Sequence, residues 1–314
     1  GEHRKILEDT GKSLVLRKLA EEKKDELTLL GGSLRKLGYI SEVKSLLSEF
    51  VQYRIEPEDL TQIMEQNKSN PQLYFKLKDM KVIYESFRQY LKDTYLTAEE
   101  LLKALEDTVE QSRSVRNSVI VLDGYHGFTP IQLGLIGRLL MLTDELYVTM
   151  TLDHREEPFQ MEAEHQLFYA TKKTIQDLKK VAEQTGVEIR KPIMLGKDKI
   201  WRYKDAPALR FLEEHIYRHS RRFWNEETDA VTLFAARTPR SEVECISREI
   251  LKLVRDEKFR YREMAVVTGD LDTYGPLFEQ TFARLGIPGF MDAKRDVLKN
   301  PFVEFLRALL LAVQ

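Results

Sequence analysis

The chain has 314 residues, of which 42% are hydrophobic and 32% are charged, with a formal net charge of −2. Two or three packed units fit this length, because a single core rarely grows beyond roughly 250 residues. Basic and acidic side chains nearly balance along the chain: 20 and 21 in residues 1–116, 16 and 17 in 117–228, and 13 and 13 in 229–314. This balance excludes a basic arm, so DNA binding would have to come from a folded groove or from parts outside this chain.

Cysteine usage and hydropathy set two further limits. Cys245 is the only cysteine, which excludes an internal disulfide framework and a cysteine-built zinc or iron–sulfur site in this chain. No apolar run approaches the roughly 18 residues of a membrane span, and the first residues lack a signal-peptide core. We therefore expect a cytoplasmic protein with no membrane partner. The chain begins without Met and stops within the apolar helical pattern of 306–314, which predicts a piece of a longer protein.

The first 116 residues carry the pattern of helices throughout. Apolar side chains recur at spacings of three and four in 43–51 and again in 73–91, which predicts two helices with one buried face each. Two helix starts are typical capping sequences: Asn70 before Pro71, and Thr97 with Glu100. We find no strand signals here and expect an all-helical insertion over 1–116.

The pattern changes at Ser118–Asp123, whose letters are SVIVLD. A continuous β-branched run of this kind is typical of a strand buried on both faces of a parallel sheet. Alternating strands and helices then predict βαβ units and an α/β fold over 117–228. The elements expected are helices over Ile131–Leu142, Glu162–Thr185 (ended by Gly186) and Pro207–Phe223, and strands over Glu145–Leu152 and Val187–Leu195.

Residues 229–314 repeat this alternation after an acidic hinge at Asn225–Asp229. We expect them to start a second α/β domain. The strands expected are Ala230–Ala235, Met264–Thr268 and a short one near Phe290; the helices are Ser241–Asp256 with a Ser241 and Glu244 capping box, Tyr274–Leu285 closed by Gly286, and a last one from Pro301.

One sequence resembles the end of a phosphate-binding P-loop and is set aside. Thr10-Gly11-Lys12-Ser13 ends like that motif, but Ile6 stands where the motif requires a glycine, and the residues before it are too polar for the required strand. We interpret it as a polar helix start.

Asp123 ends the first predicted strand. In an α/β sheet the ligand crevice lies beyond the carboxyl ends of the strands, and an aspartate there commonly holds Mg²⁺ through a water in P-loop ATPases. The following letters, DGYHGFTPIQ, resemble the acidic motif of superfamily 1 helicases, Asp-Glu-x-x-(x)-Thr…Gln, and Gln132 stands nine residues after the aspartate. A strand that ends in Asp-Gly is also a common turn, so this motif alone leaves both interpretations open.

The surrounding sequence resembles one family. "YLTAEELLKALEDTVEQS", followed by "VIVLDGYHGFTPIQLGLIGRLL" and "ELYVTMTLD", is similar to the B subunit of bacterial AddAB-type helicase–nucleases (RexB in some bacteria), where an Asp-Gly-Phe-x-x-Phe-Thr-Pro element replaces the helicase acidic motif. A later block that begins "RSEVECISREILKLVRDEKF" resembles the opening of the family's second motor domain. The resemblance spans most of the chain, is weakest in the first 40 residues, and implies RecA-like, superfamily 1-like parallel sheets in 117–228 and 229–314.

The resemblance also implies a degenerate motor. In active helicases a glutamate after the aspartate orients or deprotonates the attacking water, and Gly124 has no side chain for that task. Arg202 stands where the arginine of the helicase Asn-Tyr-Arg-Ser motif reaches phosphates; the alternative is a surface arginine beside aromatic neighbours. We assign no catalytic and no metal residues. The residues of the vestigial motif are Asp123, Gly124, Phe128, Thr129, Pro130 and Gln132.

By resemblance, the parent complex unwinds and degrades DNA ends in double-strand break repair and recombination, and its B subunit is implicated in recognising the Chi sequence. The resemblance implies DNA and an AddA-type helicase–nuclease subunit as partners, in a heterodimer. It also implies ATP, Mg²⁺ and a 4Fe–4S cluster in the full-length complex, none of them in this fragment. Alone, the fragment is expected to lack ATPase and nuclease activity and to bind single-stranded DNA weakly, if at all.

Two rival functions stay open. One is an active ATPase fragment of a true superfamily 1 helicase, which Gly124 and the missing P-loop disfavour. The other is a helical adaptor with no nucleic-acid role, which the even charge allows. Among other candidates, Trp201, Tyr203 and Trp224 are typical of core aromatics rather than base-stacking residues. Asp270 fits a capped turn better than a metal site.

Overall fold

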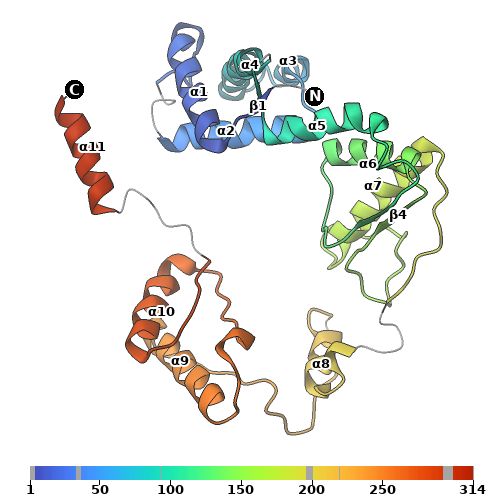
Figure 1. The fold of residues 1–314 in the computed structure, drawn as a ribbon, viewed down its shortest axis with the longest axis vertical. Helices are drawn as coiled ribbons and strands as arrows, with labels where there is room; N and C mark the ends of the chain where they lie inside the picture. The colour runs from blue at the N-terminus through green and yellow to red at the C-terminus, as the bar shows by residue number, and fades with distance from the viewer. Residues whose placement is uncertain are drawn as a thin grey trace. The chain divides into compact units, whose positions relative to one another are not determined.

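The structure, a computed structural model, describes residues 4–32, 37–92, 94–195, 201–218, 220–292 and 300–313. The chain divides into two compact units, residues 1–204 and 205–314, which are described separately (Figure 1). No helix among the described residues is long and apolar enough to cross a membrane. The boundaries predicted at 116/117 and 228/229 stay a prediction.

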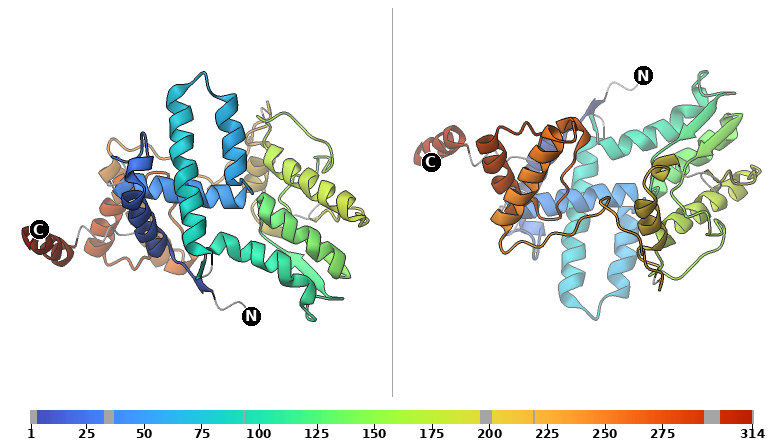
Figure 2. Two further views of the ribbon diagram at one scale, coloured as in Figure 1. Left: turned by 90° about the horizontal axis from the view of Figure 1, so that it is seen from above. Right: turned by 90° about the horizontal axis from the view of Figure 1, so that it is seen from below.

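Unit 1 consists mainly of helices, and those within residues 9–91 enclose an apolar core. Helices α3 and α4 pack side by side, as do α6 and α7 (Figure 2). The most deeply buried core side chains, each at most 2% exposed, include Leu16, Ile40, Leu60, Met80, Ile83 and Leu91. The helices are α1 (Asp9–Glu22), η1 (Lys24–Glu26), α2 (Leu37–Gln52), α3 (Pro57–Gln66), α4 (Pro71–Leu91), α5 (Ala98–Thr108), η2 (Val109–Gln111), α6 (Pro130–Leu142), α7 (Tyr169–Thr185) and η3 (Trp201–Tyr203).

Both helix starts predicted in the first region are confirmed. The Asn70 side chain accepts a hydrogen bond from the N–H of Leu73 at 3.2 Å and opens α4. At α5 the Thr97 hydroxyl accepts from the N–H of Glu100 at 3.2 Å, and the Glu100 carboxylate accepts from the N–H of Thr97 at 2.9 Å. These reciprocal bonds satisfy backbone donors that the first helical turn leaves unpaired.

A pair of very short strands joins the two ends of the helical region. β1 (Lys5–Ile6) runs parallel to β2 (Tyr95–Leu96), with Lys5 opposite Tyr95 and Ile6 opposite Leu96. The prediction of no strand in 1–116 is therefore wrong by these two segments. Two residues are too few to leave an alternating pattern in the sequence, so only the tertiary pairing reveals them.

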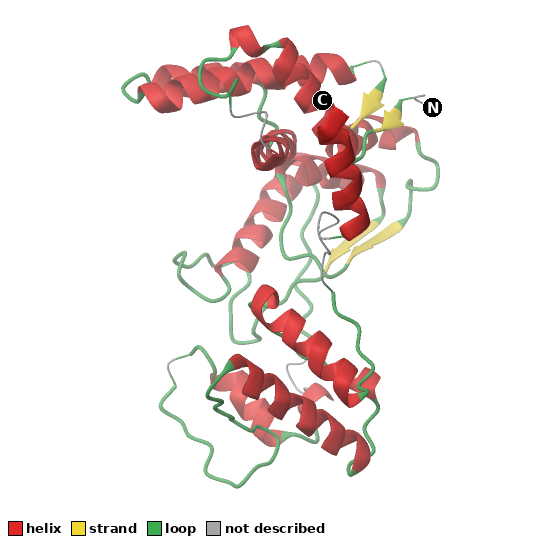
Figure 3. Cartoon of the chain, turned by 90° about the vertical axis from the view of Figure 1, so that its left-hand side faces the viewer, coloured by secondary structure: helices red, strands yellow, loops and turns green. Residues whose placement is uncertain are grey.

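The first strand predicted in the α/β region is confirmed, and it pairs with the second. β3 (Val119–Leu122) runs parallel to β4 (Glu145–Val148), with Val119 opposite Glu145 (Figure 3). The expected burial on both faces is wrong, because the side chains of Val119 and Val121 are 59% and 58% exposed. Within the described part of the chain the sheet holds only these two strands, and no described element covers its second face.

The prediction of four further strands is wrong for the described residues. The segments Val187–Leu195, Ala230–Ala235, Met264–Thr268 and the one near Phe290 have no ladder partner among the described residues. Leu195, Leu233 and Val267 are 84%, 98% and 92% exposed, so their apolar side chains face no sheet or helix within the described ranges. An apolar, β-branched run becomes a strand only where a second strand supplies its backbone hydrogen bonds.

Two helices of the α/β regions are shorter than predicted, and three begin earlier: α6 at Pro130 rather than at residue 131, α9 at Pro239 rather than at residue 241, and α10 (Leu271–Leu285) at Leu271 rather than at residue 274. α7 begins at Tyr169 rather than at residue 162, and its end at Gly186, with a φ of 70°, is confirmed. α8 ends at His215 rather than at residue 223. α9 begins at Pro239, and Thr238 with Ser241 forms the capping box instead of the predicted pair, because proline suits the first helical position.

Unit 2 has helices and no strand among its described residues. α9 and α10 pack together around Val243, 0% exposed, and Phe278, 6% exposed. The capped turn predicted at Asp270 is confirmed, since its carboxylate accepts from the N–H of Thr273 at 3.0 Å. That hydrogen bond lowers the pKa of Asp270. The helices are α8 (Pro207–His215), α9 (Pro239–Arg255), η4 (Tyr261–Glu263), α10 (Leu271–Leu285) and α11 (Pro301–Val313).

One buried carboxylate organises the turn between α1 and α2. Asp79, in the middle of α4 and 0% exposed, accepts three backbone hydrogen bonds: from Thr28 at 2.9 Å, Leu29 at 2.6 Å and Leu30 at 2.9 Å. Leu30, 2% exposed, is thereby held in the core. A carboxylate needs several donors to be buried at tolerable cost, and three amides provide them.

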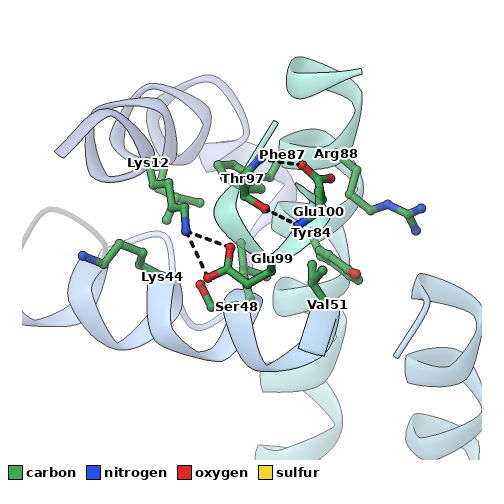
Figure 4. A pocket seen from close by; sticks show the side chains of 12 residues that line it. Lys12, Lys44, Ser48, Val51, Tyr84, Phe87, Arg88, Thr97, Glu99 and Glu100 are labelled. Atoms are coloured by element: carbon green, nitrogen blue, oxygen red, sulfur yellow. Dashed lines mark hydrogen bonds and ion pairs between the residues drawn. The ribbon is translucent and has the colours of Figure 1, made fainter. Parts of the chain in front are cut away.

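A second buried charge lies where α1, α2 and α5 meet (Figure 4). The Lys12 ammonium, on a residue 4% exposed, donates to both oxygens of Glu99, at 3.2 and 2.9 Å. Burial acts to raise the pKa of Glu99, but the bonds from Lys12 and Ser48 outweigh it and the pKa is lowered. The cavity beside this pair, about 10 Å³, is too small for any ligand larger than water. The lysine of the P-loop-like sequence is thus engaged within a helix that begins at Asp9.

We predict that Asp79→Asn lowers the free energy of unfolding by about 3 kcal/mol, because the amide offers one acceptor and turns a donor group toward backbone N–H groups. Urea unfolding followed by circular dichroism measures it. Asp107→Asn on α5, an exposed carboxylate with an ion pair to Lys103, is the matched control and is expected to cost at most about 0.5 kcal/mol. Equal losses in both variants would contradict the assigned role of Asp79.

The Lys12–Glu99 pair predicts a defined loss of stability in acid. Because the folded pKa of Glu99 lies below its ordinary 4.5, its contribution is present above that pH and disappears as the pH falls through the lowered value. At pH 7, Glu99→Gln should cost about 2 kcal/mol, and the difference from wild type should shrink below pH 4.5. Urea titrations at a series of pH values measure it. For the exposed Glu49→Gln control we expect a difference within about 0.5 kcal/mol throughout.

Candidate functional site

The candidate site lies at the carboxyl end of the β3–β4 pair. Asp123 directly follows β3, and its carboxylate accepts a hydrogen bond from the hydroxyl of Thr149, which directly follows β4. The same hydroxyl accepts from the N–H of Gly124 at 3.4 Å. The backbone N–H of Thr149 donates to the carbonyl of Leu122 at 3.0 Å, so the parallel pairing itself places threonine beside aspartate. The prediction placed Asp123 correctly and did not identify Thr149.

Gly124 has a backbone conformation that most residues avoid. Its φ is +79°, in the left-handed region, where an L side chain is strained even though no atom lies within 4 Å of a built Cβ. Any L residue at position 124, glutamate included, would therefore meet backbone strain but no steric clash.

The end of the motif starts a helix. Thr129 is the N-cap of α6, Pro130 is its first residue, and the Gln132 side chain accepts a hydrogen bond from the N–H of Thr129 at 2.8 Å. The Gln132 carbonyl is thus occupied by the helix start. The Thr129 hydroxyl is buried, and no described residue offers it a hydrogen bond. Phe128 stacks on Tyr125 with ring centroids 5.0 Å apart and stiffens the loop.

Helix α7 holds the loops that follow both strands. Its Thr174 hydroxyl donates to the carbonyl of His126 at 3.4 Å, in the loop after β3. Its Lys172, 1% exposed, contacts Glu156 at 2.9 Å and Glu162 at 2.7 Å, in the segment after β4. Burial acts to lower the pKa of Lys172, but the two carboxylates outweigh it and the pKa is raised. The sequence pattern does not single out Lys172 as a contact to this segment, because it predicts that residues 162–168 belong to the helix itself.

An ion pair connects α6 to the helical region. Arg54, after α2, contacts Glu106 of α5 at 2.7 Å, and the pair lies against Gly134 of α6. A Cβ on Gly134 would lie 1.8 Å from Nη2 of Arg54 and 2.7 Å from Oε1 of Glu106. A side chain at position 134 would therefore require the ends of the Arg54 and Glu106 side chains to shift.

Arg202 lies in η3 and is not brought to the motif by any direct contact. Its guanidinium lies over the ring of Tyr203, 5.8 Å from the centroid, and among the described residues it has no hydrogen bond or ion pair with 123–132. Its assignment as a phosphate or DNA contact stays a prediction, as does the assignment of the motif residues.

The chemistry available at this site is limited. No group of three or more His, Cys, Asp or Glu side chains among the described residues is placed to hold a metal ion. Asp123 is a single carboxylate already engaged by Thr149, and Lys12 is engaged by Glu99. These residues do not fit a nucleotide with its Mg²⁺, which requires a phosphate cradle, a lysine and a metal-holding carboxylate together.

Comparison with known proteins gives the family. The family described as "ADDB, N-terminal" matches residues 1–213. A protein of Lachnoclostridium phytofermentans, named as the B subunit of an ATP-dependent helicase/deoxyribonuclease, is 37% identical over 313 residues, covering 99% of this chain and 27% of that protein. Proteins with the same name are 33% identical in Caldanaerobacter subterraneus subsp. tengcongensis, covering 96% of this chain and 26% of the relative, and in Anoxybacillus flavithermus, covering 100% and 27%.

The chain belongs to the AddB family, and the resemblance inferred from its motifs is confirmed. It spans about a quarter of the length of these relatives. A RecA-like arrangement is not established by the two short parallel sheets and the surrounding helices.

The left-handed backbone at Gly124 predicts unequal effects of two alanine substitutions. Gly124→Ala should lower the free energy of unfolding by about 1 kcal/mol through backbone strain. Gly127→Ala, in the same loop, should change it by at most about 0.5 kcal/mol, because the added Cβ would meet the nearest atom, on Thr174, at an ordinary 3.6 Å. Thermal and urea unfolding measure both. A loss at residue 127 equal to that at 124 would contradict the assigned backbone conformation.

Proposed function

We propose that this chain is an internal part of the B subunit of an ATP-dependent DNA helicase/deoxyribonuclease and forms a helicase-like core that does not hydrolyse ATP. The observation that supports this proposal is the hydrogen bond from the Thr149 hydroxyl to the Asp123 carboxylate. Next to it lies Gly124, a glycine in a left-handed conformation at the place where a catalytic glutamate would stand. The names of the relatives, which describe one subunit of a helicase/deoxyribonuclease, support a partner subunit and DNA as the parent's context.

We infer a RecA-like sheet of which this chain supplies two strands. Parallel sheets are normally covered on both faces, whereas Val119 and Val121 of β3 are 59% and 58% exposed. Further strands and helices of the parent would pair with β3 or β4 and cover that face. The carboxyl-end position of Asp123 supports the same inference, because ligand crevices of such sheets lie at that edge.

The role we propose for this core is architectural. It would shape the path of a DNA strand and hold the AddA-type partner, in a complex acting in double-strand break repair and in response to Chi. In the parent, ATP with Mg²⁺ and an iron–sulfur cluster would belong to parts outside this chain, which has one cysteine, Cys245, and a single carboxylate at the site.

A phosphate-release assay tests this function. We expect no turnover above the buffer rate from the chain, with or without Mg²⁺ and single-stranded DNA, and none from Gly124→Glu. Hydrolysis requires a phosphate cradle, a metal-holding carboxylate and a positioned base together, and the substitution supplies only the base.

Asp123→Asn is the paired variant in that assay. Any trace of release that survives unchanged in Asp123→Asn comes from a contaminating enzyme. DNA-stimulated release from wild type or Gly124→Glu that disappears in the Asp123→Asn background would contradict the proposal and favour a true helicase ATPase fragment.

A further inference from the structure

The segment that follows α8 lacks acidic residues and carries clustered arginines. No Asp or Glu occurs between Glu214 and Glu226, while the letters between them include three arginines and three large aromatic residues. In a chain with a net charge of −2, this is a local departure from the even distribution of charge. It therefore has a potential of its own, independent of the overall balance.

Four side chains of this segment face solvent. Tyr217 and Phe223 are 77% and 80% exposed, and Arg221 and Arg222 belong to exposed residues. Within the described residues neither guanidinium takes part in an ion pair or a side-chain hydrogen bond. Both cations and both rings are therefore available to a ligand. We call these four residues, Tyr217, Arg221, Arg222 and Phe223, the basic–aromatic strip.

Aromatic contacts with α8 position the residue that follows the basic–aromatic strip. Trp224 packs on Phe211 of α8 with ring centroids 5.6 Å apart, and Phe211 stacks on His215 at 4.2 Å. Anchoring Trp224 leaves its neighbour Phe223 exposed. Tyr217 directly follows the C-cap of α8 and has a φ of 62°, a left-handed conformation that is rare for an aromatic residue.

We propose that the basic–aromatic strip is a contact site for single-stranded nucleic acid, with the two arginines on phosphates and Tyr217 and Phe223 stacked on bases. The ligand class follows from the pairing of unpaired guanidinium groups with exposed aromatic rings. This combination suits a flexible polyanion with π-faces, and base stacking on aromatic residues tolerates any sequence. The inference rests on the proposed function for its ligand and adds the place of contact.

The basic–aromatic strip fits a membrane surface or a protein partner less well than it fits nucleic acid. A membrane surface would favour lysine and arginine on one face of an amphipathic helix, whereas here the residues follow the end of α8 and lie outside any helix. A protein partner would favour a contiguous apolar patch, whereas here two arginines directly precede Phe223 and separate it in sequence from the exposed side chains of Ile216 and Tyr217. Charge complementarity and stacking together favour single-stranded nucleic acid.

Fluorescence anisotropy with a labelled oligothymidine of about 20 nucleotides tests the proposal on the whole 314-residue chain at low salt. We expect weak but saturable binding, with Arg221→Glu/Arg222→Glu losing about tenfold or more in affinity and lowering the salt slope by about 1 to 2. Phe223→Ala should lose about fivefold or more. Tyr217→Gly should also lose affinity while keeping its fold, because glycine suits a φ of 62°.

Two controls match these variants in charge and in exposure. Arg237→Glu/Arg262→Glu makes the same change in net charge at two exposed arginines of unit 2, and Phe290→Ala removes an aromatic side chain that is 92% exposed. Both are expected to bind like wild type within about twofold. Equal loss in the two double variants would show general electrostatics and overturn the site.

The remaining outcomes separate this site from the proposed function. Wild-type binding that the strip variants retain overturns the strip and leaves the proposed function standing, because the phosphate-release assay decides that function independently. Absence of oligothymidine binding by wild type up to about 100 µM, or binding of phosphatidylserine vesicles in its place, likewise overturns the strip.

Discussion

The helical region of this chain depends on charged side chains that are buried together with the hydrogen-bond donors or opposite charges that compensate them. Asp79 is the clearest case, since a carboxylate with no exposed surface is tolerable only because three consecutive amides point at it. The turn from Thr28 to Leu30 is held by α4, around which α1 and α3 pack. The ion pair of Lys12 with Glu99 is a second buried charge that is compensated by a partner. In both networks a buried charge ties segments that are far apart in the sequence to one another through hydrogen bonds.

The same residue types that suggest a motor serve as architecture at the candidate site. Thr129 and Gln132 match a helicase pattern, and in the structure they cap α6. Asp123 lies at the carboxyl end of β3, and the hydroxyl of Thr149 donates a hydrogen bond to its carboxylate. Capping, stacking and strand pairing hold this loop in shape, and none of them depends on a bound nucleotide.

Elements whose signals are local could be predicted from sequence. The capping box at Thr97 and the glycine end of α7 require only a few neighbouring residues, and β3 is a compact β-branched run. Strands at 230–235 and 264–268 could not be judged in this way, because pairing depends on a distant partner. Thr149 could have been found, since parallel strands align their ends. Lys172 could not, because its two carboxylate partners lie in the irregular segment between β4 and α7, which carries no periodic pattern.

Gly134 has a consequence for how the charge of Glu106 is compensated. Its missing side chain leaves the space that the ends of Arg54 and Glu106 occupy. A side chain at 134 would shift the ends of the Arg54 and Glu106 side chains and weaken their ion pair without excluding the substitution, because Arg54 is flexible and partly exposed. Residue 134 therefore sets how closely Arg54 can approach the buried carboxylate of Glu106, which Lys103 also contacts at 3.5 Å.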